Sequence, residues 1–279
     1  MVTMDTRFWT GFLCLLSTVS VIYSLKIGAF NINSLTGSKL KTHPGLLDIY
    51  VKIMSRYDIA VIEEVMDTKG INDILQALNS HGGGPYALQL SGRLGGPGFE
   101  EYFAFLYRTD HVSVRKIYQY PDTHDYFEHE PFAILFHTTH AAIHDFAIAA
   151  VHIRSRDTVS EMNHLVDVYD SLKSHFGNEN ILFAGDLNAD CFGLSLASLH
   201  KNLFYTDHRF HWLILSTEDT IVSGISSCAY DRFVVAGSEF LGAVVPFSAK
   251  SFHYDFEYRL NYRESHSVSD HYPIEMELR

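Results

Sequence analysis

The stretch Ile181-Leu-Phe-Ala-Gly-Asp-Leu-Asn188 carries a short apolar run into a glycine, an acid and an amide. A continuous apolar run that ends at a turn signal is typical of a strand covered on both faces. Polar side chains directly after such a strand lie at one edge of its sheet, where the ligand sites of open sheets form. The segment therefore predicts a buried strand over 181–183 that delivers Asp186 and Asn188 to a functional edge.

The same kind of run recurs along the chain. Strands are predicted over Leu25–Ile32, Ile59–Ile62, Tyr102–Tyr107, Phe132–Phe136, Phe146–Val151, Ile181–Phe183, Phe233–Ala236 and Tyr272–Leu278. Apolar residues at helical spacing predict helices over Pro44–Tyr57 and Val159–Phe176. Strands mixed with helices favour an α/β fold in which layered sheets carry helices outside. The sequence contains neither an internal repeat nor a low-complexity linker, so residues 25–279 are expected to form one domain.

Polar residues gather where these predicted strands begin or end. If the strands that end in polar residues run antiparallel to those that begin with them, both sets of ends meet at one edge. Nine side chains would then line a single cleft: Asn31, Glu64, Glu101, His152, Asp186, Asn188, Asp231, Asp270 and His271. Any one of these acids alone is more often a solvated turn residue, whereas nine at strand ends indicate a site.

The chemistry of these residue types suits hydrolysis of a phosphodiester. Carboxylate and amide oxygens bind Mg²⁺ or Ca²⁺, whereas zinc would call for Cys and His ligands. A bound cation stabilises the charge that builds on a phosphoryl oxygen. Two histidines can divide the proton transfers, one deprotonating water and the other protonating the leaving oxygen. Each needs a carboxylate to hold its tautomer, and Glu101 and Asp231 are available.

Residues 1–24 have the pattern of a secretory signal peptide. Arg7 gives a weak positive start, and the apolar run Phe8–Ile22 is shorter than a membrane span of about 20 residues. Cleavage is expected after Ser24, with Ser20 as a second position; an uncleaved anchor or a buried helix are the alternatives. We therefore expect a secreted, extracellular, monomeric protein with no membrane segment.

Cysteine usage and charge agree with secretion. Removal of residues 1–24 removes Cys14 and leaves Cys191 and Cys228, a pair that suits an oxidising compartment. Two free buried thiols are the alternative. The net charge of −12 argues against passive, sequence-blind adhesion to nucleic acid, which needs a basic face. It does not argue against an enzyme whose acidic cleft holds cations.

The motifs resemble the endonuclease/exonuclease/phosphatase superfamily, and within it the deoxyribonuclease I family. The matching segments run in the family's order over nearly the whole chain after residue 24: 26–32, 55–65, 107–108, 130–131, 146–152, 167–169, 185–189, 228–232 and 269–273. Gly-Asp-x-Asn and Ser-Asp-His are shared across the superfamily. Cys-x-Tyr-Asp-Arg at 228–232 and Tyr-Asp-Ile-x-x-x-x-Glu-Val at 57–65 are more specific to the deoxyribonuclease I branch.

The resemblance implies a four-layer fold, with a two-sheet β-sandwich core flanked by helices. It also implies a role for each matching residue. Glu64 would be the principal Mg²⁺ ligand with Asn31 and Asp270 nearby, Asp186 and Asn188 would hold the scissile phosphate or a second ion, His152 with Glu101 and His271 with Asp231 would be the acid/base pairs, and Cys191–Cys228 would be a disulfide. The implied activity is a secreted DNA endonuclease that leaves 5′-phosphate and 3′-hydroxyl ends. The implied cofactors are Mg²⁺ and Ca²⁺, with Mn²⁺ as an alternative.

Several positions depart from the family pattern. Met66 and His129 stand where family members carry arginines, and Phe99 stands for a groove-stacking Tyr. Phosphate and groove contacts supply much of the affinity for DNA, so this loss weakens expected binding. Arg154 and Arg156 follow His152 and are candidates to replace the charge. Phe99, His129 and Arg154 are therefore the candidate DNA contacts.

Other departures concern partners and calcium. Phe132 is bulkier than the family residue that docks actin, so actin binding is not expected. Asp122, Asp125 and Glu130 are candidate Ca²⁺ ligands, with solvated loop acids as the equal alternative. Two further functions fit the same fold: a phosphoesterase for a nucleotide, RNA or phospholipid head group, and a weakly active DNA-binding or toxin-like protein. Fold by itself does not choose among these functions.

Overall fold

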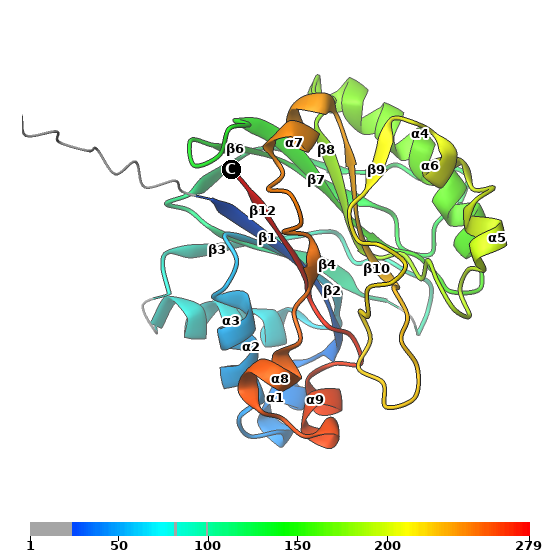
Figure 1. Ribbon diagram of the computed structural model, residues 1–279. Helices are drawn as coiled ribbons and strands as arrows, with labels where there is room; N and C mark the ends of the chain where they lie inside the picture. Colours follow the sequence, from blue (N-terminus) through cyan, green and yellow to red (C-terminus); the bar gives the residue numbers. More distant parts are fainter. Residues whose placement is uncertain (1–23, 81–82, 99) are drawn as a thin grey trace, which may run out of the picture.

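Two six-stranded sheets pack face to face in the computed structural model, which describes residues 24–80, 83–98 and 100–279 (Figure 1). The first sheet has the order β11-β12-β1-β2-β4-β3, with bounds Lys250–Ser251, Ile274–Leu278, Leu25–Leu35, Ile59–Val65, Tyr102–Arg108 and Tyr86–Leu90. The second has the order β5-β6-β7-β8-β10-β9, with bounds Val112–Gln119, Phe132–Thr138, Asp145–His152, Ile181–Asp186, Asp231–Ala236 and Phe210–Trp212. The sandwich expected from the family resemblance is confirmed.

Strand directions bring the polar ends together, as the sequence predicted. β1 runs parallel to β2, and β7 runs parallel to β8, so the polar residues that end these strands share one edge. β4, β10 and β12 each run antiparallel to one of these strands and begin at the same edge. In the second sheet, Asp186 is in register with His152 on one side and with Asp231 on the other.

The core between the sheets is built from large apolar side chains of both. Phe103 and Phe105 of β4 face Phe136 of β6 and Phe146 of β7, and all four are fully buried. Phe105 packs edge-on against Phe132 at a ring separation of 5.9 Å. Burial of each such side chain contributes roughly 1.5–3 kcal/mol, so the interface between the sheets contributes strongly to stability. It holds the strand ends of the two sheets in a fixed relation.

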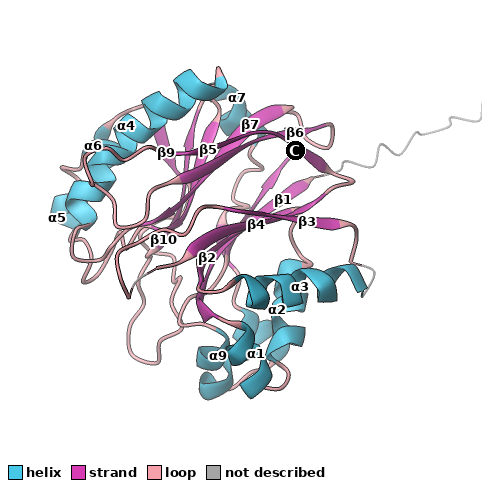
Figure 2. Cartoon of the chain, turned by 180° about the vertical axis from the view of Figure 1, so that it is seen from behind, coloured by secondary structure: helices cyan, strands magenta, loops and turns pink. Residues whose placement is uncertain are grey.

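Helices cover the outer faces and give the four layers (Figures 1 and 2). On the first sheet lie α2 (Leu46–Met54), α3 (Thr68–Ser80), α8 (Tyr254–Tyr258) and α9 (Tyr262–Val268), with α1 (Gly37–Thr42) beside α3. On the second lie α4 (Thr158–Phe176), α5 (Leu196–Leu199) and α6 (Leu203–Thr206). Helix α7 (Ser238–Ala243) follows β10. Among the described residues, no helix is both long and apolar enough to cross a membrane.

The structure corrects several boundaries. The predicted helix over 44–57 is shorter, because Gly45 has a left-handed φ of 91° and the regular helix begins only at Leu46. The predicted last strand begins at Ile274 and not at Tyr272, since Pro273 has no N–H to donate to a ladder. Strands β3, β5, β9 and β11, helix α3 and the short helices α1 and α5 to α9 were not predicted. Strands β9 and β11 are three and two residues long, too short for a periodic pattern.

Candidate active site

The ends of β1 and β2 are irregular, and this irregularity exposes Glu64. The register between β2 and β4 shifts between Ile62 and Val65, and Glu64 has a left-handed φ of 58°. The bulge turns Glu63 into the core and leaves Glu64 at the cleft. Its carboxylate accepts hydrogen bonds from the Asn31 amide at 3.0 Å and the Ser34 backbone N–H at 2.9 Å. A strained acid held in this way is typical of a functional position.

A second acid, Asp270, is held by the same end of β1. Asn33 donates its side-chain amide to Asp270 Oδ1 at 2.8 Å, and its backbone N–H to Asn31 Oδ1 at 3.0 Å. Lys39 Nζ caps the Asn33 carbonyl at 2.5 Å, and burial lowers the pKa of this lysine despite the negative charges of Glu64 and Asp270. Asn33 and Lys39 were not predicted, although the unbroken polar pair at 33–34 after Ile32 was a visible signal.

Each predicted histidine pair forms. His152 Nδ1 lies 3.0 Å from Glu101 Oε1, and His271 Nδ1 lies 2.8 Å from Asp231 Oδ2. Asp186 lies between the two rings, with its Oδ2 at 3.9 Å from His152 Nε2 and at 3.7 Å from His271 Nε2. Both histidines therefore turn one ring nitrogen to a buried carboxylate and the other to the same central acid.

The loop after β8 holds Asp186 in place. The Asn188 backbone N–H donates to Asp186 Oδ1 at 2.8 Å, and the Asn188 side-chain amide donates to the Ile153 carbonyl at 2.9 Å. Asn31 Nδ2 reaches Asp186 Oδ2 at 3.5 Å, which links the second sheet to the Glu64 side of the site. Gly185 is required here: its φ is 138°, and an added Cβ would lie 2.2 Å from the Val151 carbonyl.

The histidines and the central acid titrate far from their ordinary ranges. Burial alone would lower the pKa of His152, but Glu101 through its charge and hydrogen bond, together with Asp186, raises it well above its usual value. Burial opposes a similar rise for His271, whose pKa Asp231 and Asp186 bring to about 10. Burial, with the charge of Asp231, raises the pKa of Asp186 to about 6. The described site is therefore rich in negative charge that protons partly neutralise.

Glu63 is the residue that the sequence interpretation passed over. It is fully buried, and neither carboxylate oxygen has a hydrogen-bond partner among the described residues. Burial raises its pKa well above the ordinary range, and the charge of Asp231 adds to this rise. The only sequence signal was the doubled acid at 63–64, which a sheet would normally place on opposite faces.

The donor set fits a hard divalent cation. Glu64, Asp186 and Asp270 supply carboxylate oxygens, and Asn31, which contacts both Glu64 and Asp186, supplies an amide. Burial, followed by the charge of Asp231, raises the pKa of Asp186, and a cation bound at these oxygens would oppose that rise. Within the part of the chain that the structure describes, two groups have ligand atoms close enough together to share an ion: Asp186, Asp231 and His271, and Glu101, His129 and His152.

The predicted DNA contacts lie in different surroundings. The His129 ring stacks on the His152 ring at 4.9 Å, so His129 adjoins the site. Arg154 forms an ion pair with Glu128, which also accepts the Gly96 backbone N–H at 3.1 Å. Phe99 lies outside the described residues. His129 therefore lies next to His152, whereas Arg154 is held by an acid that the sequence did not single out, and both remain predicted DNA contacts.

Two of the three predicted calcium acids, Asp125 and Glu130, line a cavity next to this edge, whereas Asp122 does not. The cavity has a volume of about 580 Å³ and is lined by residues that include Asp125, Glu130, Arg154 and Glu161. Asp122 accepts the Phe127 backbone N–H at 2.7 Å and so shapes the loop. Glu161 of α4 is 1 % exposed, and burial raises its pKa to about 7.

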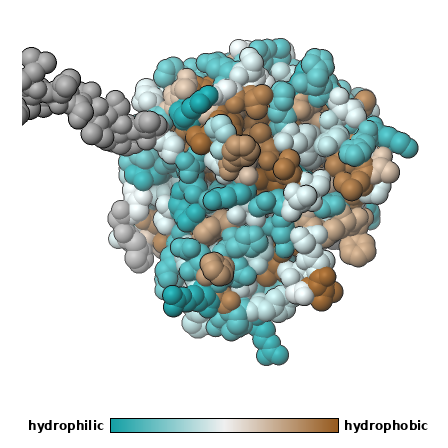
Figure 3. Space-filling view, viewed as in Figure 1, coloured by the Kyte–Doolittle hydropathy of each residue, from teal (hydrophilic) through white to brown (hydrophobic). Residues whose placement is uncertain are grey.

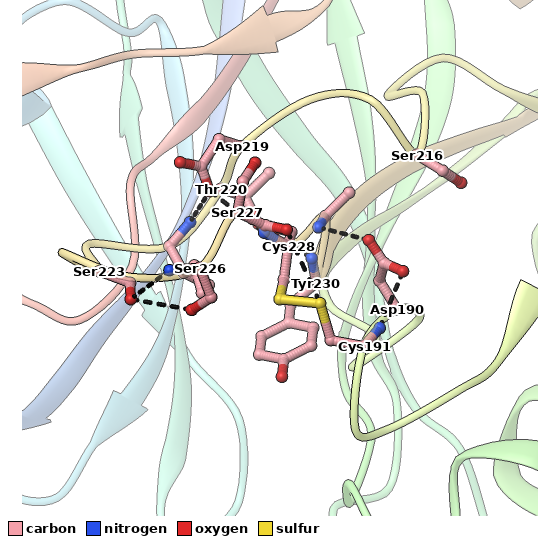
Figure 4. The surroundings of a disulfide bond; sticks show 12 residues. Asp190, Cys191, Ser216, Asp219, Thr220, Ser223, Ser226, Ser227, Cys228 and Tyr230 are labelled. Atoms are coloured by element: carbon pink, nitrogen blue, oxygen red, sulfur yellow. Dashed lines mark hydrogen bonds between the residues drawn. A yellow bond between two sulfur atoms is a disulfide. The ribbon is translucent and has the colours of Figure 1, made fainter.

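The predicted disulfide is present and braces the His271 side (Figure 4). Cys191 and Cys228 join two loops with a Cα separation of 5.9 Å. Asp190 accepts the backbone N–H groups of Cys191 and Ala229 at 2.8 and 3.0 Å. Thr220 Oγ1 accepts the Asp231 backbone N–H at 3.2 Å, so the bridged loops support one catalytic candidate directly.

Comparison of the chain with known proteins shows the family to which it belongs. Deoxyribonuclease-1 of Mus musculus is 38 % identical over 275 residues, which is 96 % of each chain. Deoxyribonuclease gamma of Mus musculus is 37 % identical over 266 residues, 92 % of this chain and 85 % of that one. No family model matches. An endonuclease/exonuclease/phosphatase family protein from Bacteroides thetaiotaomicron shares the fold at a TM-score of 0.59 and 18 % identity, over 91 % of this chain and 97 % of that one. With this level of identity over nearly its whole length, the chain belongs to the deoxyribonuclease I family of hydrolases.

Proposed function

We propose that the protein is a secreted, divalent-metal-dependent DNA endonuclease that leaves 5′-phosphate and 3′-hydroxyl ends. The observation that carries the proposal is the placement of Asp186 between His152 and His271, each with its own buried carboxylate. A phosphodiester needs one proton removed from water and one delivered to the leaving oxygen. Two imidazoles on either side of one acidic centre can perform both transfers on a single phosphate.

The carboxylates fix which ring nitrogen reacts. Glu101 and Asp231 each bind Nδ1, so Nε2 of both histidines faces Asp186 and the cleft. The carboxylates also stabilise the positive charge of whichever ring holds the proton. The ring that accepts the proton of the attacking water must be neutral at that step, and a cation bound at the neighbouring acids would lower its raised pKa toward that state. The other begins charged and donates its proton to the leaving oxygen.

The acids and amides at the strand ends would hold the cation and the phosphate. Glu64, Asn31 and Asp270 are the proposed Mg²⁺ ligands, and Asp186 with Asn188 would contact the scissile phosphate or a second ion. When bound, Mg²⁺, Ca²⁺ or Mn²⁺ supplies positive charge to the phosphoryl oxygens. Asn33 and Ser34 orient the ligands, and such supporting bonds affect metal affinity strongly.

Plasmid nicking tests the proposal. The purified protein is incubated with supercoiled plasmid, Mg²⁺ and Ca²⁺, and relaxation of the plasmid is followed on a gel. We expect nicking that stops with chelator and with His152→Ala, and that persists with His208→Ala, a control at an exposed histidine near the far end of β10. DNA ligase should reseal the nicks, since it needs a 5′-phosphate beside a 3′-hydroxyl. Plasmid that stays supercoiled with wild-type protein would overturn the proposal.

Secretion is proposed from residues 1–24 and from the disulfide. A disulfide persists in oxidising compartments, which agrees with export. Expression of the full chain in a secreting cell should release a protein whose first residue is Leu25. Mass spectrometry of the medium and of the cell pellet checks this, and retention of the intact chain in the cells would contradict it.

A further inference from the structure

Two apolar side chains are held almost fully in solvent beside the site. Phe192 is 98 % exposed and Ile225 is 99 % exposed. Phe192 follows Cys191 on the loop after β8, and Ile225 lies three residues before Cys228 on the loop that precedes β10. The disulfide joins these two loops. In Figure 1 the second loop, drawn in yellow, projects beyond the strands, and Figure 3 shows apolar residues on this face only in separate patches.

The loop that carries Phe192 is closed by its own hydrogen bonds. Cys191 has a left-handed φ of 48°, and its N–H is bound by the Asp190 side chain. The Asp190 carbonyl accepts the N–H groups of Gly193 and Leu194 at 3.0 and 3.2 Å. An added Cβ at Gly193 would lie 2.1 Å from the Asn188 carbonyl, so the turn is closely packed. The hydrogen-bonded backbone of this turn therefore presents the Phe192 ring to solvent.

Residues next to Phe192 and Ile225, which we call the apolar tips, contact residues of the candidate active site. The Phe192 backbone N–H is directed at the Tyr230 hydroxyl, and the Tyr230 ring lies 6.2 Å from the His271 ring. Three residues before Ile225, the Val222 N–H donates to the Asp270 carbonyl at 2.7 Å. Ile221 pairs with His271 in an isolated antiparallel β-bridge of the backbone. The loops that carry Phe192 and Ile225 therefore adjoin the His271 side of the site.

The cationic side chains on the opposite side of the site are engaged by acids and so are poor partners for DNA phosphates. On the His152 side, Arg154 is paired with Glu128 and Arg93 with Glu100, and the chain as a whole has a net charge of −12. Affinity that depends on phosphate neutralisation is therefore weak. A base can stack on an aromatic ring without any charged contact. Apolar side chains that insert into a duplex must unstack a base step, which costs free energy.

Building on the proposed nuclease activity, we propose that Phe192 and Ile225 contact unstacked bases next to the scissile phosphate. The preferred substrate is DNA whose bases are already free to leave the stack, such as a gapped or single-stranded stretch. In fully paired DNA the unstacking cost opposes the same contact. Phe192 stacks on the base, and Ile225 fills the space that the base vacates.

The test compares two DNA substrates and one small substrate. kcat/KM is measured for a fully paired duplex, for the same duplex with a one-base gap, and for bis-nitrophenyl phosphate, which is too small to reach the tips. The wild-type protein should prefer the gapped duplex. Phe192→Ser combined with Ile225→Ser should lower kcat/KM on the gapped duplex about tenfold, in line with the loss of one stacked base. Hydrolysis of the small diester should not change.

Controls separate stacking from general effects. Phe247→Ser removes an equally exposed Phe near the far end of β12 and should leave all three rates unchanged. Phe192→Trp should keep the preference for the gapped duplex, because the larger ring still stacks. The double variant should melt at the wild-type temperature, since neither side chain is buried.

The outcomes are distinguishable. If the wild-type protein cleaves no DNA, the proposed function fails and this proposal fails with it. If the wild-type protein cleaves DNA and the double variant keeps the same preference for the gap, only the stacking proposal is overturned. Loss of binding to phosphatidylcholine vesicles in the double variant, with DNA cleavage unchanged, would assign the tips to a lipid surface and also overturn it.

Discussion

The two carboxylate–histidine pairs have the same contacts but different support. In each pair one residue comes from each sheet: Glu101 precedes β4 and pairs with His152 of β7, whereas Asp231 of β10 pairs with His271 before β12. Each pair therefore spans the sandwich, and Asp186 lies between them. Packing of the two sheets sets the geometry of both pairs together.

Beyond these contacts the two sides diverge. The His152 side borders an open cavity, and its neighbours include the stacked ring of His129 and the buried acid Glu161. The His271 side is backed by the disulfide loops and by Ser269, whose Oγ accepts the His271 N–H at 2.9 Å. The comparison shows that both sides keep the same carboxylate–imidazole contact although their neighbouring residues differ. The contact serves the proton transfers, and the differing neighbours are available to contact the substrate.

Removing either imidazole should have the largest effect. We expect His152→Ala and His271→Ala each to lower the nicking rate by about a thousandfold, because neither ring can perform both proton transfers. The double variant should be little worse than either single one, since the two act as a unit. Plasmid nicking rates check this. A single variant that kept most of its activity would show that the two pairs are not equivalent.

Removing the disulfide, which supports only the His271 side, should lower the stability of the whole fold. Cys191→Ser with Cys228→Ser opens a loop of 37 residues and should lower the free energy of unfolding by about 3–4 kcal/mol. Urea unfolding of the variant and of the oxidised wild-type protein measures the difference. An unchanged midpoint would show that hydrogen bonds from Asp190 and Thr220 suffice to hold the loops.

Glu161 should make the His152 side sensitive to pH. Its pKa in the folded protein is about 7, above its ordinary value, so folding favours the neutral acid. This stability is present below the ordinary pKa and is lost as pH rises through 7. Glu161→Gln should therefore be more stable than wild type by about 3 kcal/mol near pH 8 and equal to it near pH 4.

Urea midpoints at several pH values measure the effect of Glu161→Gln. The matched control is Glu257→Gln, which changes an exposed acid on α8 and should follow the wild-type curve at every pH. A Glu161→Gln curve parallel to wild type would mean that Glu161 is charged in the folded protein.

Releasing Arg154 should give the smallest effect. If Arg154 contacts DNA, Glu128→Gln frees it from its ion pair and should tighten DNA binding about two- to threefold, with a steeper dependence on salt by about one charge. Asp157→Asn, which frees the exposed Arg156, is the matched control. Salt-dependent binding measurements decide the matter, and unchanged binding in Glu128→Gln would remove Arg154 from the contact surface.

Much of the fold could be predicted because the central strands are continuous apolar runs. All eight predicted strands exist, and the expected convergence of their polar ends is confirmed by the pairing of β7, β8 and β10. The missed strands lie at or near the sheet edges, where β5 alternates irregularly between buried and exposed residues. Such edges have no strong period, because only one side or face of the strand is packed.

The sequence by itself determined the residue types of the site, their order along the chain and the end of the sheet on which they lie. These follow from strand period and direction, which are local properties. Only the tertiary structure decided that Glu63 turns inward while Glu64 faces the cleft, that Arg154 is held by Glu128, and that Phe192 stays in solvent. A bulge, an ion pair between distant segments and the exposure of one ring depend on how the layers pack, and no local pattern encodes them.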